Sequence, residues 1–136
     1  MTFSEVNFTS LIETVKKAAH DILVSLSHEV IVSQNNKCKA DGSIVTIADQ
    51  RMQTSLHDEL RSSYPNILFM GEEMSSAEHQ HVLSNTEKLI WCLDPLDGTT
   101  NYSNGLPFWA VSLALMNSSG AIFGVVYDPL RDECFS

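Results

Sequence analysis

The apolar residues of this chain recur with one period before Pro65 and with another after it, and this change constrains the fold. Between residues 5 and 33 they recur at steps of three and four, which predicts one long amphipathic helix. The same spacing from about Thr46 predicts a second helix, which Pro65 ends. After Pro65 the apolar residues form short runs between turn-forming residues, a pattern that is typical of strands.

The predicted strands follow one another with short connections, apart from a polar connection expected at residues 74–87. They are residues 67–70, 89–93, 108–116, 121–127 and a last strand that starts at 133. We therefore expect an α+β fold in one domain, residues 1–136, with two helices packed on a mostly antiparallel sheet. The last strand is unfinished at Ser136, so we expect either that the natural domain continues or that another chain covers this sheet edge.

The composition excludes several classes of partner. The chain has 17 Asp and Glu against 8 Lys and Arg, a formal net charge of −9, whereas nucleic-acid phosphates are bound by clustered Lys and Arg. No nucleic-acid partner is therefore expected. Three cysteines without a CxxC pair give no support to a zinc site or a disulfide framework. We see no secretory signal and no run of 18 apolar residues, so no membrane association is expected and the cytoplasm is the expected location.

Two acidic segments each follow a predicted strand directly. The first is Gly71-Glu72-Glu73, and the second is Asp94-Pro95-Leu96-Asp97-Gly98-Thr99-Thr100. Residues at the ends of adjacent strands point to a common crevice, so Glu72, Asp94 and Asp97 converge if the two strands are neighbours. Carboxylates that lie so close repel one another unless a cation sits between them. Oxygen ligands without Cys or His favour magnesium, manganese or calcium over zinc.

The turn in the second segment offers further groups to a phosphate ester. Pro95 stiffens the turn, and the backbone carbonyl of Leu96 is free to be another oxygen ligand. Gly98 lets the backbone approach a ligand closely, and exposed amides at Thr99 and Thr100 favour an anion. Metals beside such amides predict metal-assisted hydrolysis of a phosphate ester, in which magnesium polarises the phosphoryl oxygens and activates a water. In this scheme Glu72 holds metal and orients the water, and Thr99 accepts or relays its proton.

Taken alone, each segment also has an ordinary explanation as a loop or turn, and other motifs compete for the same residues. An EF-hand with Gly98 at its sixth position would have Leu93 first, Pro95 third and Asn104 twelfth, so the acids are missing. An aspartyl-phosphate enzyme would need its nucleophile where Pro95 stands. A simple calcium-binding or structural α+β domain is the hypothesis left beside the phosphatase.

Aromatic and histidine side chains outside these segments are assigned structural places. Trp91, Phe108 and Trp109 are expected in the core rather than in a substrate platform. His79 and His81 lie in the polar connection without a third ligand nearby, so they are expected on the surface.

Residues 91–102, Trp-Cys-Leu-Asp-Pro-Leu-Asp-Gly-Thr-Thr-Asn-Tyr, closely resemble the signature of the inositol monophosphatase family, within the wider group that includes fructose-1,6-bisphosphatase. Residues 71–73 lie at the expected distance upstream, and residues 41–49 resemble the family's D-x-V-T-x-x-D segment. Residues 108–112 and 124–127 resemble the strands that follow. The resemblance spans nearly the whole chain.

The resemblance implies the N-terminal part of a layered α/β/α/β/α fold and a lithium-sensitive phosphatase. It implies two or three magnesium ions and a small phosphorylated polyol or sugar, such as inositol 1-phosphate, as substrate. Its implied metal ligands are Glu72, Asp94, the Leu96 carbonyl, Asp97 and Asp49. Its implied catalytic residues are Glu72 and Thr99, and its implied substrate-binding residues are Glu72, Leu96, Asp97, Gly98 and Thr99. A homodimer is expected for the full-length protein.

Three departures from the family pattern matter. Family members run to about twice this length, on the order of 250 residues, and their second half supplies another metal-binding aspartate and most substrate contacts. The alternative hypothesis is therefore a truncated, inactive fragment or subunit that needs a second chain. Ile44 stands where proline is common, and Tyr102 where phenylalanine is common.

Overall fold

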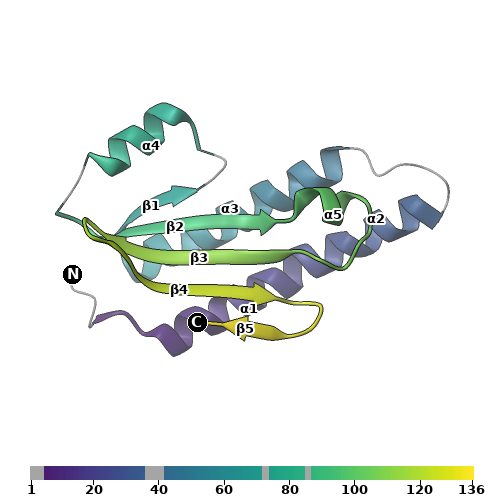
Figure 1. Ribbon diagram of the computed structural model, residues 1–136, viewed down its shortest axis with the longest axis horizontal. Helices are drawn as coiled ribbons and strands as arrows, with labels where there is room; N and C mark the ends of the chain where they lie inside the picture. The colour runs from purple at the N-terminus through teal and green to yellow at the C-terminus, as the bar shows by residue number, and fades with distance from the viewer. Residues whose placement is uncertain (1–4, 36–41, 72–73, 85–86) are drawn as a thin grey trace.

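The computed structural model places a layer of helices on one face of a five-stranded sheet (Figure 1). It describes residues 5–35, 42–71, 74–84 and 87–136. In Figure 1 the helices α1, α2 and α3 all lie behind the sheet, and α4 lies beside the edge strand β1. Together these elements confirm the predicted α+β fold with a mostly antiparallel sheet.

The N-terminal segment forms one long helical run, as the apolar spacing predicts. It consists of α1 (Phe8–Ala18), the π-helical η2 (Ala19–Val24) and α2 (Ser25–Asn35). The run begins at Phe8 because the side chain of Asn7 accepts a hydrogen bond from the Ser10 amide at 3.0 Å and so caps the helix. The sequence pattern did not predict the π-helical segment.

The second predicted helix is α3 (Gly42–Ser63), which starts a turn earlier than expected and ends before Pro65. Its buried side chains face the sheet together with those of the long helical run. The largest fully buried side chains of this core are Leu23, Met52, Leu56, Trp91, Leu93, Leu96, Tyr102, Leu113, Leu115 and Tyr127. Helices and sheet thus share one apolar layer.

The sheet has the order β1-β2-β3-β4-β5. Its strands are β1 (Leu68–Gly71), β2 (Ile90–Asp97), β3 (Ala110–Asn117), β4 (Gly120–Asp128) and β5 (Glu133–Phe135). Strands β1 and β2 pair in parallel, and every later neighbour pairs antiparallel. The sheet is therefore mixed at the edge that leads into the first acidic segment.

The prediction that residues 74–87 form only a polar connection is wrong, because they contain helix α4 (Ser76–Leu83). The Ser75 hydroxyl accepts from the Glu78 amide at 3.1 Å, and the Glu78 carboxylate accepts from the Ser75 amide at 3.3 Å. This reciprocal capping box starts a helix whose apolar periodicity is weak. The Ser-x-x-Glu spacing in the sequence was the signal that could have predicted this helix.

Phe108 is a second correction, because its side chain is 59% exposed instead of buried in the core. Its ring lies 4.9 Å from the guanidinium carbon of Arg131, which is cation–π geometry at the surface. Trp91 and Trp109 are buried, as predicted.

Tyr127 joins the helical layer to the end of the sheet. Its buried hydroxyl donates to the Asp132 carboxylate at 2.7 Å and lies 2.8 Å from Nε2 of His20. Because the tyrosine proton is used by Asp132, the His20 nitrogen must be the donor in the second bond. Burial, then the hydrogen bond and charge of Asp132, raise the pKa of Tyr127.

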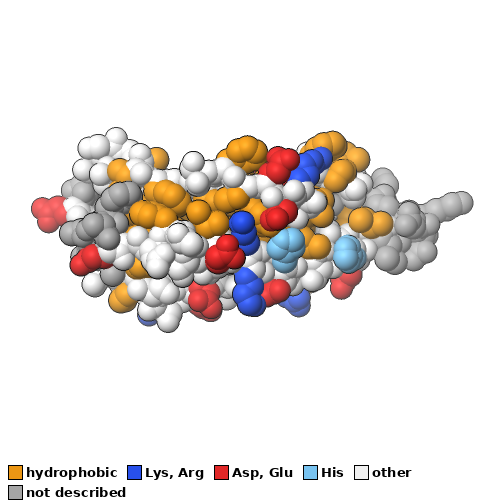
Figure 2. All heavy atoms as spheres, turned by 90° about the horizontal axis from the view of Figure 1, so that it is seen from below, with side chains coloured by type: hydrophobic (Ala, Val, Ile, Leu, Met, Phe, Trp, Pro, Cys, Tyr) orange, Lys and Arg blue, Asp and Glu red, His pale blue; other side chains and the backbone are white. Residues whose placement is uncertain are grey.

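The surface is mixed in character. Viewed from below, hydrophobic side chains form a band along the molecule, beside charged and histidine side chains (Figure 2). Among the described residues, no helix combines the length and the apolar character that a bilayer span requires.

Candidate metal and phosphate site

The two acidic segments belong to neighbouring strands, which was the condition for their convergence. The prediction that the second strand ends before Asp94 is wrong, because β2 continues to Asp97. Gly71, the last residue of β1, pairs with Leu93 of the parallel strand β2, and Asp94 is the next residue of β2. Glu72 and Glu73 lie outside the described residues. The last described residue before the first acidic segment therefore lies beside the residue that precedes Asp94.

The second acidic segment turns out of the sheet through a register shift. Asp94 still pairs with Ser112 of β3, whereas Asp97 pairs with Ala110, and the register shifts between them. The Leu96 amide lies 3.3 Å from Oδ1 of Asp94, and the Leu96 side chain is buried. The turn is anchored by Leu96, and it leaves Asp94 partly buried and Asp97 exposed.

Gly98 has a backbone conformation that only glycine adopts readily. Its φ is 90°, and a Cβ there would lie 2.8 Å from the Phe108 carbonyl oxygen. The same carbonyl accepts a hydrogen bond from the Asn101 side-chain amide at 2.9 Å. The chain after β2 is thus held against the start of β3 by close backbone contact.

The short helix α5 (Thr99–Ser103) follows Gly98, and its residue Tyr102 attaches it to the rest of the molecule. The buried Tyr102 hydroxyl donates to the Leu23 carbonyl of η2 at 2.8 Å, and its ring meets Trp109 edge-on at 4.9 Å between centroids. Burial is the main cause that raises the pKa of Tyr102, followed by the negative charges of Asp49 and Glu29. Thr99, the first residue of this helix, is exposed.

Asp49 lies on α3, which packs against α5. Its side chain is only 7% exposed, and among the described residues it is the one charged side chain in the buried class. A buried carboxylate is expensive unless charge or hydrogen bonds compensate it. The negative charge of Asp49 is one of the causes that raise the pKa of Tyr102 in α5.

A pocket of about 310 Å³ lies beside Asp94, at the point where β1 and β2 end. Its lining residues are Met70, Gly71, His79, Cys92, Leu93, Asp94, Ser112 and Ala114. Burial, and then the negative charge of Asp94, raise the pKa of the Cys92 thiol.

The structure brings part of the predicted site together. Asp94, Leu96 and Asp97 are among the last four residues of β2, and Gly98 and Thr99 lead directly into α5. The carboxylates and carbonyl among them suit a hard cation such as magnesium. Within the described ranges, no group of three or more His, Cys, Asp or Glu side chains could hold a metal ion. The predicted ligand set includes Glu72, which is outside those ranges.

His79 is a site neighbour that sequence reasoning missed, since it was expected on the surface. It is partly buried on α4, and its Nε2 lies 2.6 Å from the Gly71 carbonyl oxygen. His81, on the same helix, is exposed as predicted. The capping box at Ser75 was the signal that could have placed His79 on a helix beside β1.

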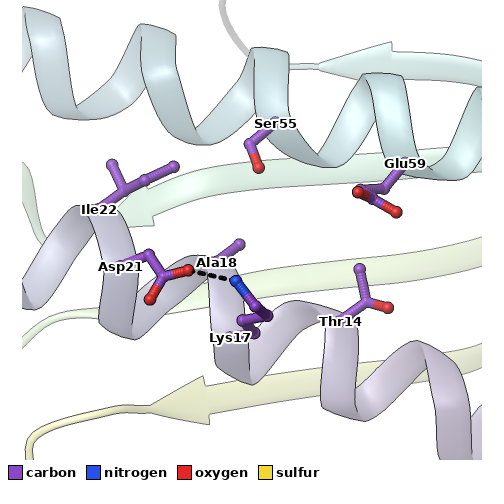
Figure 3. A pocket seen from close by; sticks show the side chains of 7 residues that line it. All are labelled: Thr14, Lys17, Ala18, Asp21, Ile22, Ser55 and Glu59. Atoms are coloured by element: carbon purple, nitrogen blue, oxygen red, sulfur yellow. Dashed lines mark hydrogen bonds and ion pairs between the residues drawn. The ribbon is translucent and has the colours of Figure 1, made fainter.

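A different pocket, of about 150 Å³, lies between the N-terminal helical run and α3 (Figure 3). Lys17 and Asp21 form an ion pair of 2.7 Å at its rim, and Ser55 and Glu59 face them from α3. The Asp21 hydrogen bond is the main cause that raises the pKa of Lys17. None of the predicted site residues lines this pocket, and its lysine already has a carboxylate partner.

Comparisons with known proteins agree with the fold. The model of the inositol monophosphatase family matches residues 5–136. Inositol monophosphatase 1 of Sus scrofa is 38% identical over 93 residues, which are 68% of this chain and 33% of that protein. Inositol monophosphatase 2 of Solanum lycopersicum is 34% identical over 125 residues, 92% of this chain and 45% of that protein.

A solved structure shows the same arrangement of elements. The extragenic suppressor protein suhB of Bartonella henselae superposes with a TM-score of 0.67 and 28% identity, over 93% of this chain and 47% of that chain. The chain thus spans between a third and a half of the length of these relatives. With a family match over residues 5–136 and the fold of its solved relatives, this chain belongs to the inositol monophosphatase family.

Proposed function

We propose that the protein containing this chain is a magnesium-dependent phosphomonoesterase that hydrolyses a small polyol or sugar phosphate such as inositol 1-phosphate. The observation that carries the proposal is the parallel pairing of β1 with β2, because it directs both acidic segments to one edge of the sheet. Membership of the inositol monophosphatase family supports the same chemistry.

The metal ligands in this proposal are the Asp94 and Asp97 carboxylates and the Leu96 carbonyl, completed by Glu72 and Asp49. All five groups offer oxygen, the donor that magnesium prefers, and two or three ions are proposed. When bound, magnesium supplies the positive charge that polarises the phosphoryl group. The lithium sensitivity of the family is part of the proposal.

Phosphate binding and water activation are assigned to groups near these ligands. The Gly98 and Thr99 amides, at the start of α5, are the groups that would hold the phosphate. Glu72 and Thr99 orient the attacking water and take up its proton, and Leu96 and Asp97 border the substrate. The homodimer and the cytoplasmic location stay predictions.

The alternative is that this chain is inactive alone and needs a second chain. It is favoured by the share of the relatives that the chain covers, between 33% and 47%. Incubating the chain alone with magnesium and inositol 1-phosphate separates the alternatives. Turnover by the isolated chain excludes the need for a partner.

The proposed activity is tested in the complete protein by phosphate release from inositol 1-phosphate with magnesium present. Asp94→Asn removes a charged ligand, so we expect release to fall about 100-fold or more. Asp58→Asn, which removes one exposed charge from α3, is the matched control and keeps wild-type activity. Full activity in the Asp94→Asn variant would contradict the proposal.

A further inference from the structure

His79 makes a short hydrogen bond to the last residue of β1. Its Nε2 lies 2.6 Å from the Gly71 carbonyl oxygen. A carbonyl can only accept, so Nε2 carries the proton and donates. The bond joins α4 to the strand that it follows in sequence, eight residues earlier.

The Gly71 carbonyl belongs to a buried residue, so it requires a hydrogen-bond donor. Gly71 is buried, and β1 is an edge strand of the described sheet, with β2 as its neighbour. The carbonyl also accepts from the Met74 amide, at the longer distance of 3.2 Å. Buried backbone carbonyls are nearly always paired, and the histidine provides the shorter of these two bonds.

The position of His79 is itself well fixed. Its amide donates to the Ser75 carbonyl at 3.0 Å, within the first turn of α4. The capping box between Ser75 and Glu78 holds the start of that helix. The imidazole is therefore presented to Gly71 from a defined helix rather than from a loop.

The bond lies at the candidate site. His79, Gly71 and Asp94 line the same pocket of about 310 Å³, and Gly71 pairs with Leu93, the residue before Asp94. A shift of the Gly71 carbonyl would change where the chain leaves β1 relative to Asp94. Metal sites are sensitive to such displacements, because their ligands must be held in a narrow range of positions.

We propose that His79 is a positioning residue for the metal site, acting through the Gly71 carbonyl to hold the end of β1 in place beside Asp94. The inference rests on the proposed magnesium site, and it adds a residue from α4 to the groups that build it. His79 is given no contact with metal or substrate in this role.

The test is a calorimetric titration of the chain with Mg²⁺, beside its thermal unfolding. His79→Phe keeps a ring but removes the donor, and we expect it to weaken magnesium binding about 10-fold, as loss of an outer hydrogen bond does at other metal sites. His79→Gln restores an N–H donor and is expected to bind within about 3-fold of wild type. His81→Phe, at the exposed histidine of the same helix, is the matched control and leaves affinity unchanged.

The Asp94→Asn variant separates this inference from the function on which it rests. If Asp94→Asn abolishes magnesium binding while His79→Phe binds like wild type, the positioning role is overturned and the metal site stands. If Asp94→Asn binds like wild type, the metal site itself is overturned. A His79→Phe chain that does not fold, or equal weakening by His79→Phe and His79→Gln, assigns His79 to folding alone and also overturns the proposal.

Discussion

Single buried hydroxyls connect the layers of this molecule. Tyr102 stands where phenylalanine is common in the family, and its extra oxygen donates to the Leu23 carbonyl in η2. Tyr127 makes a similar connection between His20 and Asp132.

The Tyr127→Phe variant tests this at residue scale. The substitution removes the hydrogen bonds to His20 and Asp132. We therefore expect the free energy of unfolding, measured at pH 8, to fall by about 1–2 kcal/mol. The raised pKa of Tyr127 means that its contribution is complete below the ordinary phenol pKa of about 10 and is lost as the pH rises above it. The wild type should therefore lose more stability between pH 8 and pH 11 than the variant does.

Urea denaturation at both pH values measures the two free energies. Because Tyr102 is present in both proteins, its own alkaline loss cancels in the comparison. A difference between wild type and variant that stays constant from pH 8 to pH 11 would show that the Tyr127 phenol ionises equally in the folded and unfolded chains.

At the scale of elements, the connection from β2 to α5 depends on one glycine. The register shift after Asp94 and the φ of 90° at Gly98 turn the chain back toward the start of β3. The Phe108 carbonyl lies so close that a side chain at residue 98 cannot fit without movement. The proposed metal ligands Asp94 and Asp97 come directly before this connection, and the amides proposed to hold the phosphate lie on it.

Gly98→Ala is therefore expected to lower the free energy of unfolding by about 1–3 kcal/mol, from strain at positive φ and contact with the backbone. Gly124→Ala in β4 is the matched control. There φ is not positive and the nearest atom to a Cβ is 3.9 Å away, so the stability should change little. Thermal unfolding of both variants gives the comparison, and equal stability losses would contradict this account of the turn.

Much of this element structure could be predicted because long apolar periods and turn residues carry it. The helices around Val15 and Leu56 and the strands around Trp91 and Leu113 follow from apolar spacing alone. Helix α4 could not be found that way, because its capping box at Ser75 and Glu78 carries the signal instead. The partly buried place of His79 depends on that missed helix.

The candidate site was predictable to a similar degree. Asp94 and Asp97 were placed at a strand end from the apolar run before them, and the parallel pairing of β1 with β2 agrees with the expected convergence. Phe108 was misplaced, because β3 begins only at Ala110 and the Phe108 ring lies exposed before it, against Arg131 from a distant turn. Local pattern contains no information on such a contact.

At the scale of the whole molecule, the described helices α1, α2 and α3 cover one face of the sheet (Figure 1). The predicted metal ligands Asp94 and Asp97 lie at the end of β2, where Asp97 pairs with Ala110 of β3. The chain spans between a third and a half of its relatives' length, so the substrate remains a proposal drawn from the family. Magnesium binding is the part of the proposal that can be tested on this chain itself.

Magnesium binding by the chain is the most direct test of the central claim. A calorimetric titration of wild type, Asp97→Asn and the exposed-charge control Asp58→Asn measures whether the turn, rather than net charge, binds the ion. We predict saturable binding in wild type and Asp58→Asn, and at least about 10-fold weaker binding in Asp97→Asn. Equal magnesium affinity in all three proteins would contradict the assignment of this turn as a metal site.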